Sequence, residues 1–300
     1  MDYSLTLMGQ SYCLSAPADL GICTELKPFL SGTDRSKSQF SGEIIFSFVR
    51  TVEGPSDESI LFPSESITEV RERSENKCII YNRKNKGNGF LTKSILEKGK
   101  ITVICDSSYR KNMMNTDVLL KKIYLESFFL MNRSFILHSS LIQFEGVTVA
   151  FCAPKQTGKS TQAALWEKEK GAKILNGDRA GIRLADTDDQ DSEVMAYGLP
   201  HAGSSSIYIN EGAPLKTVIL LEQAPVNTLE RMEGNVAFAR MFSQVNVPRT
   251  DELLLSLAIS HLEEMICSVP VYLLKCTPDV RAVEILYNEL FGKEEQSSHD

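Results

Sequence analysis

Residues 153–160 of the chain read Ala-Pro-Lys-Gln-Thr-Gly-Lys-Ser, the pattern of a loop that wraps around phosphate groups. In such a loop, successive backbone N–H groups point inward at the phosphates. We expect the ammonium group of Lys159 to reach the outer phosphates and the hydroxyl of Ser160 to bind Mg²⁺. A helix that begins at Ser160 would direct the partial positive charge of its N-terminus at the same phosphates.

The sequence on both sides of the loop fits this interpretation. Residues 147–152 form a short apolar run of strand length, and residues 161–170 contain good helix formers before the stop signal Gly171. One position departs from the pattern, because Ala153 stands in place of the first glycine. The alternative is an accidental turn, but the order of strand, loop and helix favours a site for ATP and Mg²⁺. Its expected residues are Ala153, Pro154, Lys155, Gln156, Thr157, Gly158, Lys159, Ser160 and Thr161.

The composition is that of an ordinary globular protein. The chain has 300 residues, enough for one large domain or two ordinary ones, with 42% hydrophobic and 24% charged residues. A formal charge of −7 argues against nucleic acid as the main partner. The chain has neither an apolar run of about 18 residues nor a signal-peptide pattern, so we expect a cytoplasmic protein without a membrane partner. The seven scattered cysteines indicate neither a disulfide framework nor a cysteine-based zinc site.

Two regions are expected along the chain. Residues 1–115 are predicted to form a β-rich N-terminal domain, with strands near residues 3–7, 43–49, 77–81 and 100–105. Structural cover, self-association and peptide recognition all remain open as its role. A capping signal at residues 115–117 predicts a helix through residue 129, which starts a second domain over residues 116–292. The polar residues 293–300 are expected to form a disordered tail.

The second region is predicted to be a mixed α/β domain. A strand over residues 135–144, a tight turn at Glu145-Gly146 and the partner strand 147–152 should form a hairpin. Further strands are predicted at residues 172–175, 181–184, 193–197, 215–221 and 271–274, with a solvated acidic turn over residues 186–191. Helices are predicted around residues 229–242, 251–266 and 279–290.

Two acids follow apolar strands in a way that suits catalysis. Asp178 follows the run 172–177, and Glu222 follows the run 218–221. An acid at the end of a strand beside the phosphate loop can reach Mg²⁺ or accept a hydroxyl proton. We prefer Asp178, because it comes directly after the helix that follows the loop and is therefore expected on an adjacent strand. Glu222 is more simply a charged residue at the end of a strand.

Three basic residues are further candidates. His138 lies on the strand before the phosphate loop, where an imidazole could handle protons, although a lone histidine on an apolar strand is more often a core residue. His201 lies in a segment rich in glycine and serine, which could cover an active site or be an ordinary connection. Arg179 could contact phosphate or form a plain salt bridge.

The order of His138, the hairpin, the phosphate loop and the Asn-Gly-Asp-Arg sequence at residues 176–179 resembles the HPr kinase/phosphorylase-like family. That family shares its P-loop fold with ATP-dependent phosphoenolpyruvate carboxykinase. The later segments 197–200, 214–222 and 269–276 are similar to a shortened branch that accompanies gene clusters for ribosomally made, modified peptides such as lasso peptides. Some of its members phosphorylate a serine of the precursor peptide. The resemblance covers roughly residues 116–292 and implies a P-loop kinase domain with a smaller β-rich N-terminal domain.

The resemblance also implies roles for individual residues. Lys159 would contact the β- and γ-phosphates, Ser160 would bind Mg²⁺, and Asp178 would act as the general base or as an acid that organises the metal. His138 would lie in the catalytic pocket. Two departures stand out: the bacterial regulators of the family have two consecutive aspartates where this chain has Gly177-Asp178, and their later acidic motif is not recognisable around residues 195–198. Reverse phosphorolysis and phosphorylation of HPr itself are therefore not expected.

These observations lead to one preferred function and two alternatives. The preferred function is an ATP-dependent serine kinase that phosphorylates a precursor peptide, with Asp178, His138 and Lys159 as catalytic residues. The first alternative is a small-molecule kinase acting, for instance, on free serine. The second is a regulatory module that binds a peptide when ATP is bound and catalyses nothing. The sequence leaves open whether the chain forms a homo-oligomer.

Overall fold

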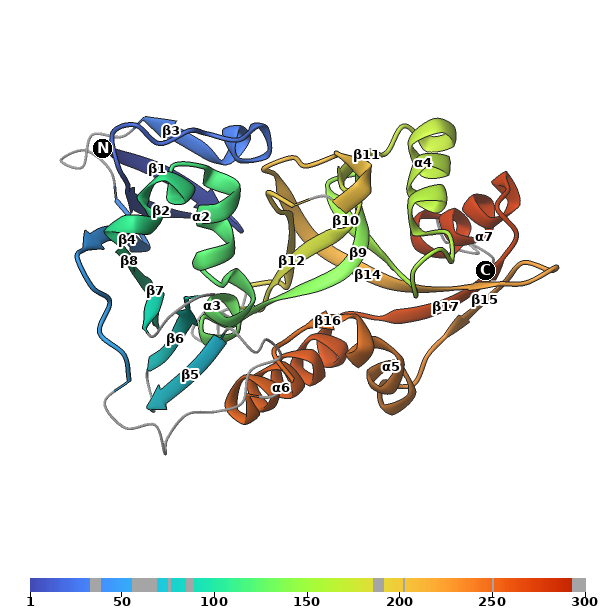
Figure 1. Cartoon of the computed structure of the whole chain (residues 1–300). Helices are drawn as coiled ribbons and strands as arrows, with labels where there is room; N and C mark the ends of the chain where they lie inside the picture. Colours follow the sequence, from blue (N-terminus) through green and yellow to red (C-terminus); the bar gives the residue numbers. More distant parts are fainter. Residues whose placement is uncertain are drawn as a thin grey trace, which may run out of the picture.

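The computed structural model describes residues 1–32, 39–55, 69–74, 77–84, 89–185, 192–201, 203–249 and 251–292. Two mixed β-sheets with helices packed around them make up this part of the chain (Figure 1). The fold is therefore of the mixed α/β kind that the sequence predicts. The predicted acidic turn 186–191 and the tail 293–300 lie outside the described residues.

The first sheet is built from residues 2–106. Parallel pairing occurs on both sides of β4 (Gly42–Val49), whereas the remaining neighbours are antiparallel. The predicted strands at residues 3–7, 43–49, 77–81 and 100–105 lie within β1 (Asp2–Leu7), β4, β6 (Lys77–Arg83) and β8 (Lys100–Asp106). In the order of pairing the strands are β3 (Leu30–Gly32), β1 (Asp2–Leu7), β2 (Gln10–Ser15), β4 (Gly42–Val49), β8 (Lys100–Asp106), β7 (Phe90–Glu97), β6 (Lys77–Arg83) and β5 (Glu69–Ser74).

Short helices lie between two strands of the first sheet and between the first sheet and the second. The 3₁₀-helix η1 (Thr24–Phe29) follows β2, and η3 (Ser107–Tyr109) and α1 (Arg110–Met113) follow β8. The single helix predicted from residue 116 is instead two helices, α2 (Thr116–Lys122) and α3 (Leu125–Met131), because Tyr124 adopts a left-handed φ of 46°. Leu119 of α2 and Phe128 of α3 are buried in the same core as the first sheet. The boundary between residues 115 and 116 stays a prediction.

The second sheet is organised around the long strand β9 (Ser134–Phe144). Its first half pairs with β12 (Arg179–Arg183), and its second half pairs with β10 (Val147–Cys152) and β11 (Lys173–Asn176). The pairing continues from β12 through β13 (Met195–Gly198) to β14 (Gly212–Gln223), which returns to β10 in parallel. The remaining strands are β17 (Val271–Cys276), parallel to β14, then β15 (Thr228–Arg231) and β16 (Val245–Asn246).

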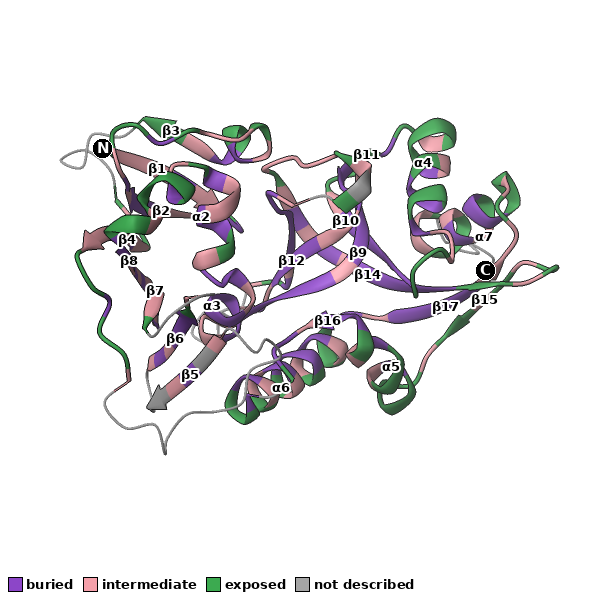
Figure 2. Cartoon of the chain, in the orientation of Figure 1, coloured by how far each residue is buried: buried purple, intermediate pink, exposed green. Residues whose placement is uncertain are grey.

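Helices cover both faces of this sheet. The helices α4 (Lys159–Lys170) and α7 (Val280–Phe291) lie on one face, and α5 (Gly234–Met241) and α6 (Glu252–Ser268) lie on the other (Figure 1). Alternate residues of β10 serve the two cores: Phe151 packs with Trp166 of α4, whereas Ala150 belongs to the core that includes Leu262 of α6. The central strands are consequently buried on both sides (Figure 2), as their unbroken apolar runs predict.

The predicted hairpin between β9 and β10 fixes the position of the phosphate loop. Glu145 and Gly146 both have left-handed backbones, with φ of 47° and 80°, as a tight two-residue hairpin turn requires. The turn pairs Phe144 with Val147 and so brings Cys152, at the end of β10, opposite Ser139. The loop after Cys152 therefore begins beside His138.

A second predicted element is also wrong in part. The region 229–242 was expected to be helical, but residues 228–231 form β15, which pairs with β17, and α5 starts only at Gly234. The pairing with β17 is a tertiary interaction that overrides the local helical pattern. Within the described residues, no helix combines the length and apolar character needed to cross a membrane.

Candidate functional site

The loop between β10 and α4 has a backbone suited to holding an anion. Gln156 and Gly158 have left-handed φ values of 68° and 117°, and Gly158 directly precedes α4, which begins at Lys159, one residue earlier than predicted. Ala153 is only 2% exposed and packs in the core, with φ outside the left-handed region. Because the backbone at position 153 does not adopt a conformation that requires glycine, an alanine is tolerated there.

Lys159 is buried at the base of the loop. Its Nζ donates a hydrogen bond to the carbonyl oxygen of Ala153 at 2.8 Å, so the side chain folds back across the loop. Burial lowers the pKa of Lys159, while the nearby Asp178 and Cys152 act in the opposite direction. The lysine is thus held where an anion entering the loop would meet it.

A cleft of about 1150 Å³, called the phosphate cleft below, opens at this end of the second sheet. The loop and the start of α4 form one wall, and His138, Gly177 and Asp178 lie at the same cavity. The structure thus brings the three predicted catalytic residues, His138, Lys159 and Asp178, into one cleft. Ser160 and Asp178, the predicted Mg²⁺ ligands, line it as well.

The sequence prediction missed the remaining wall of the cleft. Gln223 and Ala224 at the end of β14 and Thr277 after β17 line it, together with Cys276 and Pro278. These two strands run parallel to β10 and to each other, so their carboxyl ends meet at the edge where the loop starts. Ligands of open α/β sheets bind at this edge. Each residue follows an apolar run in the sequence, a pattern that could have indicated them once the parallel order was known.

Asp178 is held on a rigid turn. The buried Asn176 accepts hydrogen bonds at Oδ1 from the backbone N–H groups of Asp178 and Arg179, both at 2.9 Å. Its Nδ2 donates to the carbonyl oxygens of Leu199 and His201. The expectation that Asp178 follows a strand adjacent to β10 is wrong, since β9 lies between β11 and β10. Asp178 reaches the cleft because the backbone N–H of Ser139 on β9 donates to its carbonyl oxygen.

The Asp178 carboxylate lies between two nitrogen groups. Its Oδ1 is 3.4 Å from Nε2 of His138, and its Oδ2 is 3.5 Å from Nε of Arg179. Burial and the charge of Lys159 lower the pKa of His138, although Asp178 and the side chain of Gln244 favour the protonated form. The imidazole is therefore mainly neutral at pH 7. Arg179 forms the plain salt bridge that the sequence left as one of two alternatives.

The structure leaves little room for a side chain at position 177, beside Asp178. A Cβ atom at position 177 would lie 2.2 Å from Oγ and 2.3 Å from Cβ of Ser205. The carbonyl oxygen of Gly177 also accepts a hydrogen bond from Ser140 Oγ at 2.9 Å, which fixes the backbone. Any larger side chain at position 177 would thus displace Ser205.

The other two candidates lie outside the phosphate cleft. Glu222 is paired with Arg240 at 3.3 Å and lines a different depression, as expected for a charged residue at a strand end. His201 lies in a second pocket of about 390 Å³, and this pocket shares Asp178 with the phosphate cleft. Burial and Arg179 lower the pKa of His201.

The residues of the cleft fit a nucleotide with Mg²⁺. Gln162 on α4 has a buried Oε1 without a hydrogen-bond partner among the described residues, and it lines the cleft. The left-handed loop, the N-terminus of α4 and Lys159 supply positive potential for phosphates. Ser160 and Asp178 supply the oxygen ligands that Mg²⁺ prefers.

Comparisons with known proteins give limited information. No family model matches the chain, and no curated protein matches it either. Among solved structures, the chain is similar to the HPr(Ser) kinase/phosphatase from Coxiella burnetii, with a TM-score of 0.30 and 10% sequence identity. The match covers 52% of this chain and 96% of that protein. A similarity of this size does not establish the family.

Proposed function

We propose that the chain is an ATP-dependent phosphotransferase that phosphorylates a serine hydroxyl, most specifically on a peptide. The observation that supports this proposal best is the position of Asp178, a proton-accepting carboxylate in the same cleft as Lys159 and the phosphate loop. A nucleotide-binding loop alone would account only for ATP binding. The additional carboxylate gives the acceptor hydroxyl a partner.

The proposed chemistry depends on positioning and electrostatics. Bound MgATP would supply the phosphoryl group and the charge that activates it. The loop N–H groups and Lys159 neutralise negative charge on the phosphates, and Ser160 holds the metal. Asp178 orients the serine hydroxyl and accepts its proton at a carboxylate oxygen. His138 lies against Oδ1 of Asp178 and restricts its rotation.

The experiment is intact-mass analysis of serine-containing peptides after incubation with the protein, ATP and Mg²⁺. We expect a gain of one phosphoryl mass, and we expect Lys159→Ala to lower the rate by roughly 10²–10³-fold because a preorganised cation is lost. Lys168→Ala is the matched control, since Lys168 lies on the same helix and its side chain is 78% exposed. Full activity in Lys159→Ala would rule the proposal out.

The acceptor arms of the experiment separate the alternatives. Phosphorylation of free serine but not of peptides would show a small-molecule kinase. ATP binding that raises the melting temperature without any phosphorylated product would show a binding module. In the second case Asp178 and His138 would have structural roles only.

A further inference from the structure

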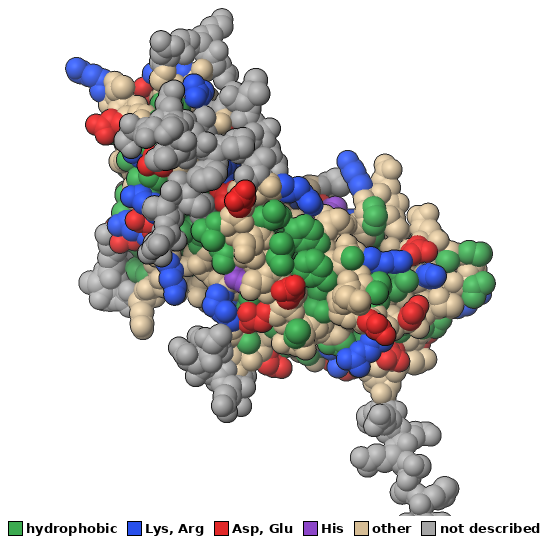
Figure 3. All heavy atoms as spheres, turned by 90° about the horizontal axis from the view of Figure 1, so that it is seen from below, with side chains coloured by type: hydrophobic (Ala, Val, Ile, Leu, Met, Phe, Trp, Pro, Cys, Tyr) green, Lys and Arg blue, Asp and Glu red, His purple; other side chains and the backbone are tan. Residues whose placement is uncertain are grey.

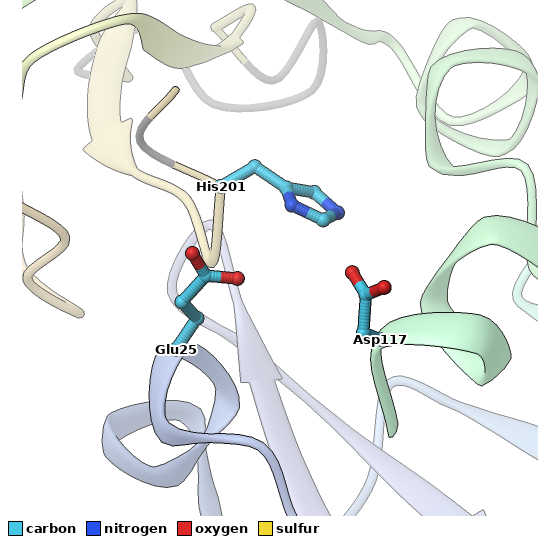
Figure 4. A group of neighbouring side chains, drawn as sticks. All are labelled: Glu25, Asp117 and His201. Carbon is cyan, nitrogen blue, oxygen red and sulfur yellow. The ribbon is translucent and has the colours of Figure 1, made fainter. Parts of the chain in front are cut away.

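Three side chains of the types that bind metals come from distant parts of the chain and line the pocket of about 390 Å³ that also includes Asp178. Glu25 comes from η1, Asp117 from the first turn of α2, and His201 from the segment after β13. Their ligand atoms all lie within 4.8 Å of one another, and each residue is partly buried. Figure 4 shows the imidazole of His201 and the two carboxylates directed at a common space. None of the three lines the phosphate cleft.

The backbone holds the three segments in place. The N–H of Cys23, just before η1, donates to Oγ1 of Thr116, and the N–H of Thr116 donates to the carbonyl oxygen of Gly21. The carbonyl oxygen of His201 is fixed by Nδ2 of Asn176 at 3.0 Å. The site therefore requires little reorganisation of the backbone before a ligand binds.

The charges of the pocket favour a cation. Its lining contains three carboxylates, those of Glu25, Asp117 and Asp178, against the two cations Lys121 and Arg179. Each cation is already paired: Lys121 with Asp117 at 2.9 Å and Arg179 with Asp178 at 3.5 Å. Among the residues that the structure describes, none forms an ion pair or a hydrogen bond with the Glu25 carboxylate.

The imidazole of His201 offers a nitrogen ligand to the space that the two carboxylates also face. Asp117 keeps a second carboxylate oxygen, because Lys121 bonds only Oδ2. One imidazole and two carboxylates with water in the remaining position suit Zn²⁺. Mg²⁺ prefers oxygen ligands in octahedral geometry and suits the set less well.

We propose that Glu25, Asp117 and His201 form a Zn²⁺ site, separate from the phosphate cleft. The metal links the N-terminal η1 to α2 and to the segment that carries His201. That segment lies beside the turn that carries Asp178. Asn176 forms hydrogen bonds with the backbone of both His201 and Asp178, and Gly203 packs against Asp178. The site thus braces the wall of the cleft that holds Asp178. The proposal does not depend on the proposed kinase activity.

The test measures metal binding without nucleotide or acceptor. The full-length chain with Cys267→Ser, which removes an exposed competing thiol, is freed of metal with a chelator and titrated with Zn²⁺ and then with Mg²⁺. We expect one equivalent of Zn²⁺, much weaker binding of Mg²⁺, and a rise in melting temperature with Zn²⁺. Zinc content after gel filtration gives the stoichiometry.

Variants locate the metal. Glu25→Gln and His201→Gln should each weaken Zn²⁺ binding by more than about tenfold. Substitution of residues that only hydrogen-bond to metal ligands already lowers metal affinity by about that factor. Glu53→Gln, which changes an exposed glutamate on the same N-terminal part, should bind Zn²⁺ as the parent does. If the parent binds no Zn²⁺, or if Glu25→Gln and His201→Gln bind it equally well, the proposal is wrong. Should one variant not fold, the other still decides.

Discussion

Asp178 and Glu222 show how two acids at strand ends come to have different environments. Asp178 lines the phosphate cleft on the turn that Asn176 fixes, whereas Glu222 is absent from the lining of the cleft and pairs with Arg240. The two residues look alike in the sequence, since each follows an apolar run. Their surroundings, and not their own chemistry, make one a catalytic candidate and the other a surface acid.

Asp178→Asn should therefore retain nucleotide binding and lose phosphoryl transfer. The amide cannot accept the proton of the acceptor hydroxyl, so we expect the turnover rate to fall by ~10²–10⁴-fold. Calorimetric titration with ATP and the rate of product formation by mass spectrometry measure the two effects separately. Glu222→Gln, as the matched control, should stay within about twofold of the wild type. A normal rate in Asp178→Asn would remove the residue from the mechanism.

The contact between Gly177 and Ser205 gives a prediction about stability. Gly177→Asp places a Cβ atom against the Ser205 side chain, and overpacking of this kind costs about 1–3 kcal/mol of unfolding free energy. The double variant Gly177→Asp with Ser205→Gly should recover much of the loss, because the obstructing side chain is gone. Urea unfolding of both variants, and of Ser205→Gly alone, measures the coupling. Independent, additive effects would show that the contact does not limit position 177.

At the level of single elements, α6 carries a histidine that destabilises the protein when it is protonated. His261 is 5% exposed, its Nδ1 has no hydrogen-bond partner among the described residues, and burial together with Arg133 lowers its pKa to about 4. The unfolded chain binds a proton near pH 6.5, so this contribution to stability is complete at higher pH and is lost as the pH falls towards 4.

We therefore expect His261→Leu to reduce the pH dependence of stability. From pH 7 to pH 5, the wild type should lose about 2 kcal/mol more unfolding free energy than the variant, because only the wild type must keep a buried imidazole unprotonated. Urea unfolding at the two pH values, with secondary structure followed by circular dichroism, gives the comparison. Equal losses in the two proteins would contradict the assignment.

Local sequence predicted most elements of the second sheet but not all of their partners. The hairpin of β9 and β10 and the helix α4 follow from apolar runs, a two-residue turn and the stop at Gly171, whose φ is 70°. The break at Tyr124 has no local signal, since a tyrosine adopts a left-handed backbone only under tertiary constraint. Gln223 and Thr277 escaped prediction for a similar reason, because the order of parallel strands is a long-range property.

At the scale of the whole molecule, residues of both sheets contribute to one of the hydrophobic cores. Ile136 of β9 and Tyr197 of β13 pack with residues of the first sheet, and Arg183 donates a hydrogen bond from Nη1 to the carbonyl oxygen of Met8 at 2.8 Å. The outer surface seen from below is mixed, with Lys and Arg side chains interspersed among Asp and Glu (Figure 3). The strong connection between the parts thus lies inside the molecule.

A chain that begins at residue 116 should accordingly be poorly folded. It would expose the faces of α2 and α3 that contain Leu119 and Phe128, which the first sheet buries in the intact protein. We expect it to bind a hydrophobic dye and to unfold with a broad thermal transition, whereas the full-length chain unfolds cooperatively. A sharp transition without dye binding would show that residues 116–292 fold independently.

The arrangement around β9 also sets an order for events during synthesis on the ribosome. The hairpin partner β10 follows β9 after two residues, while β11, β12 and β16 lie further along the chain. A local hairpin forms within microseconds, long before the next residues are added. In the emerging chain, β10, which leads into the phosphate loop, can thus be paired with β9 before Asp178 has been synthesised. Assembly of the cleft then waits for the late strand β17, so a stalled or shortened chain would carry the loop without its opposite wall.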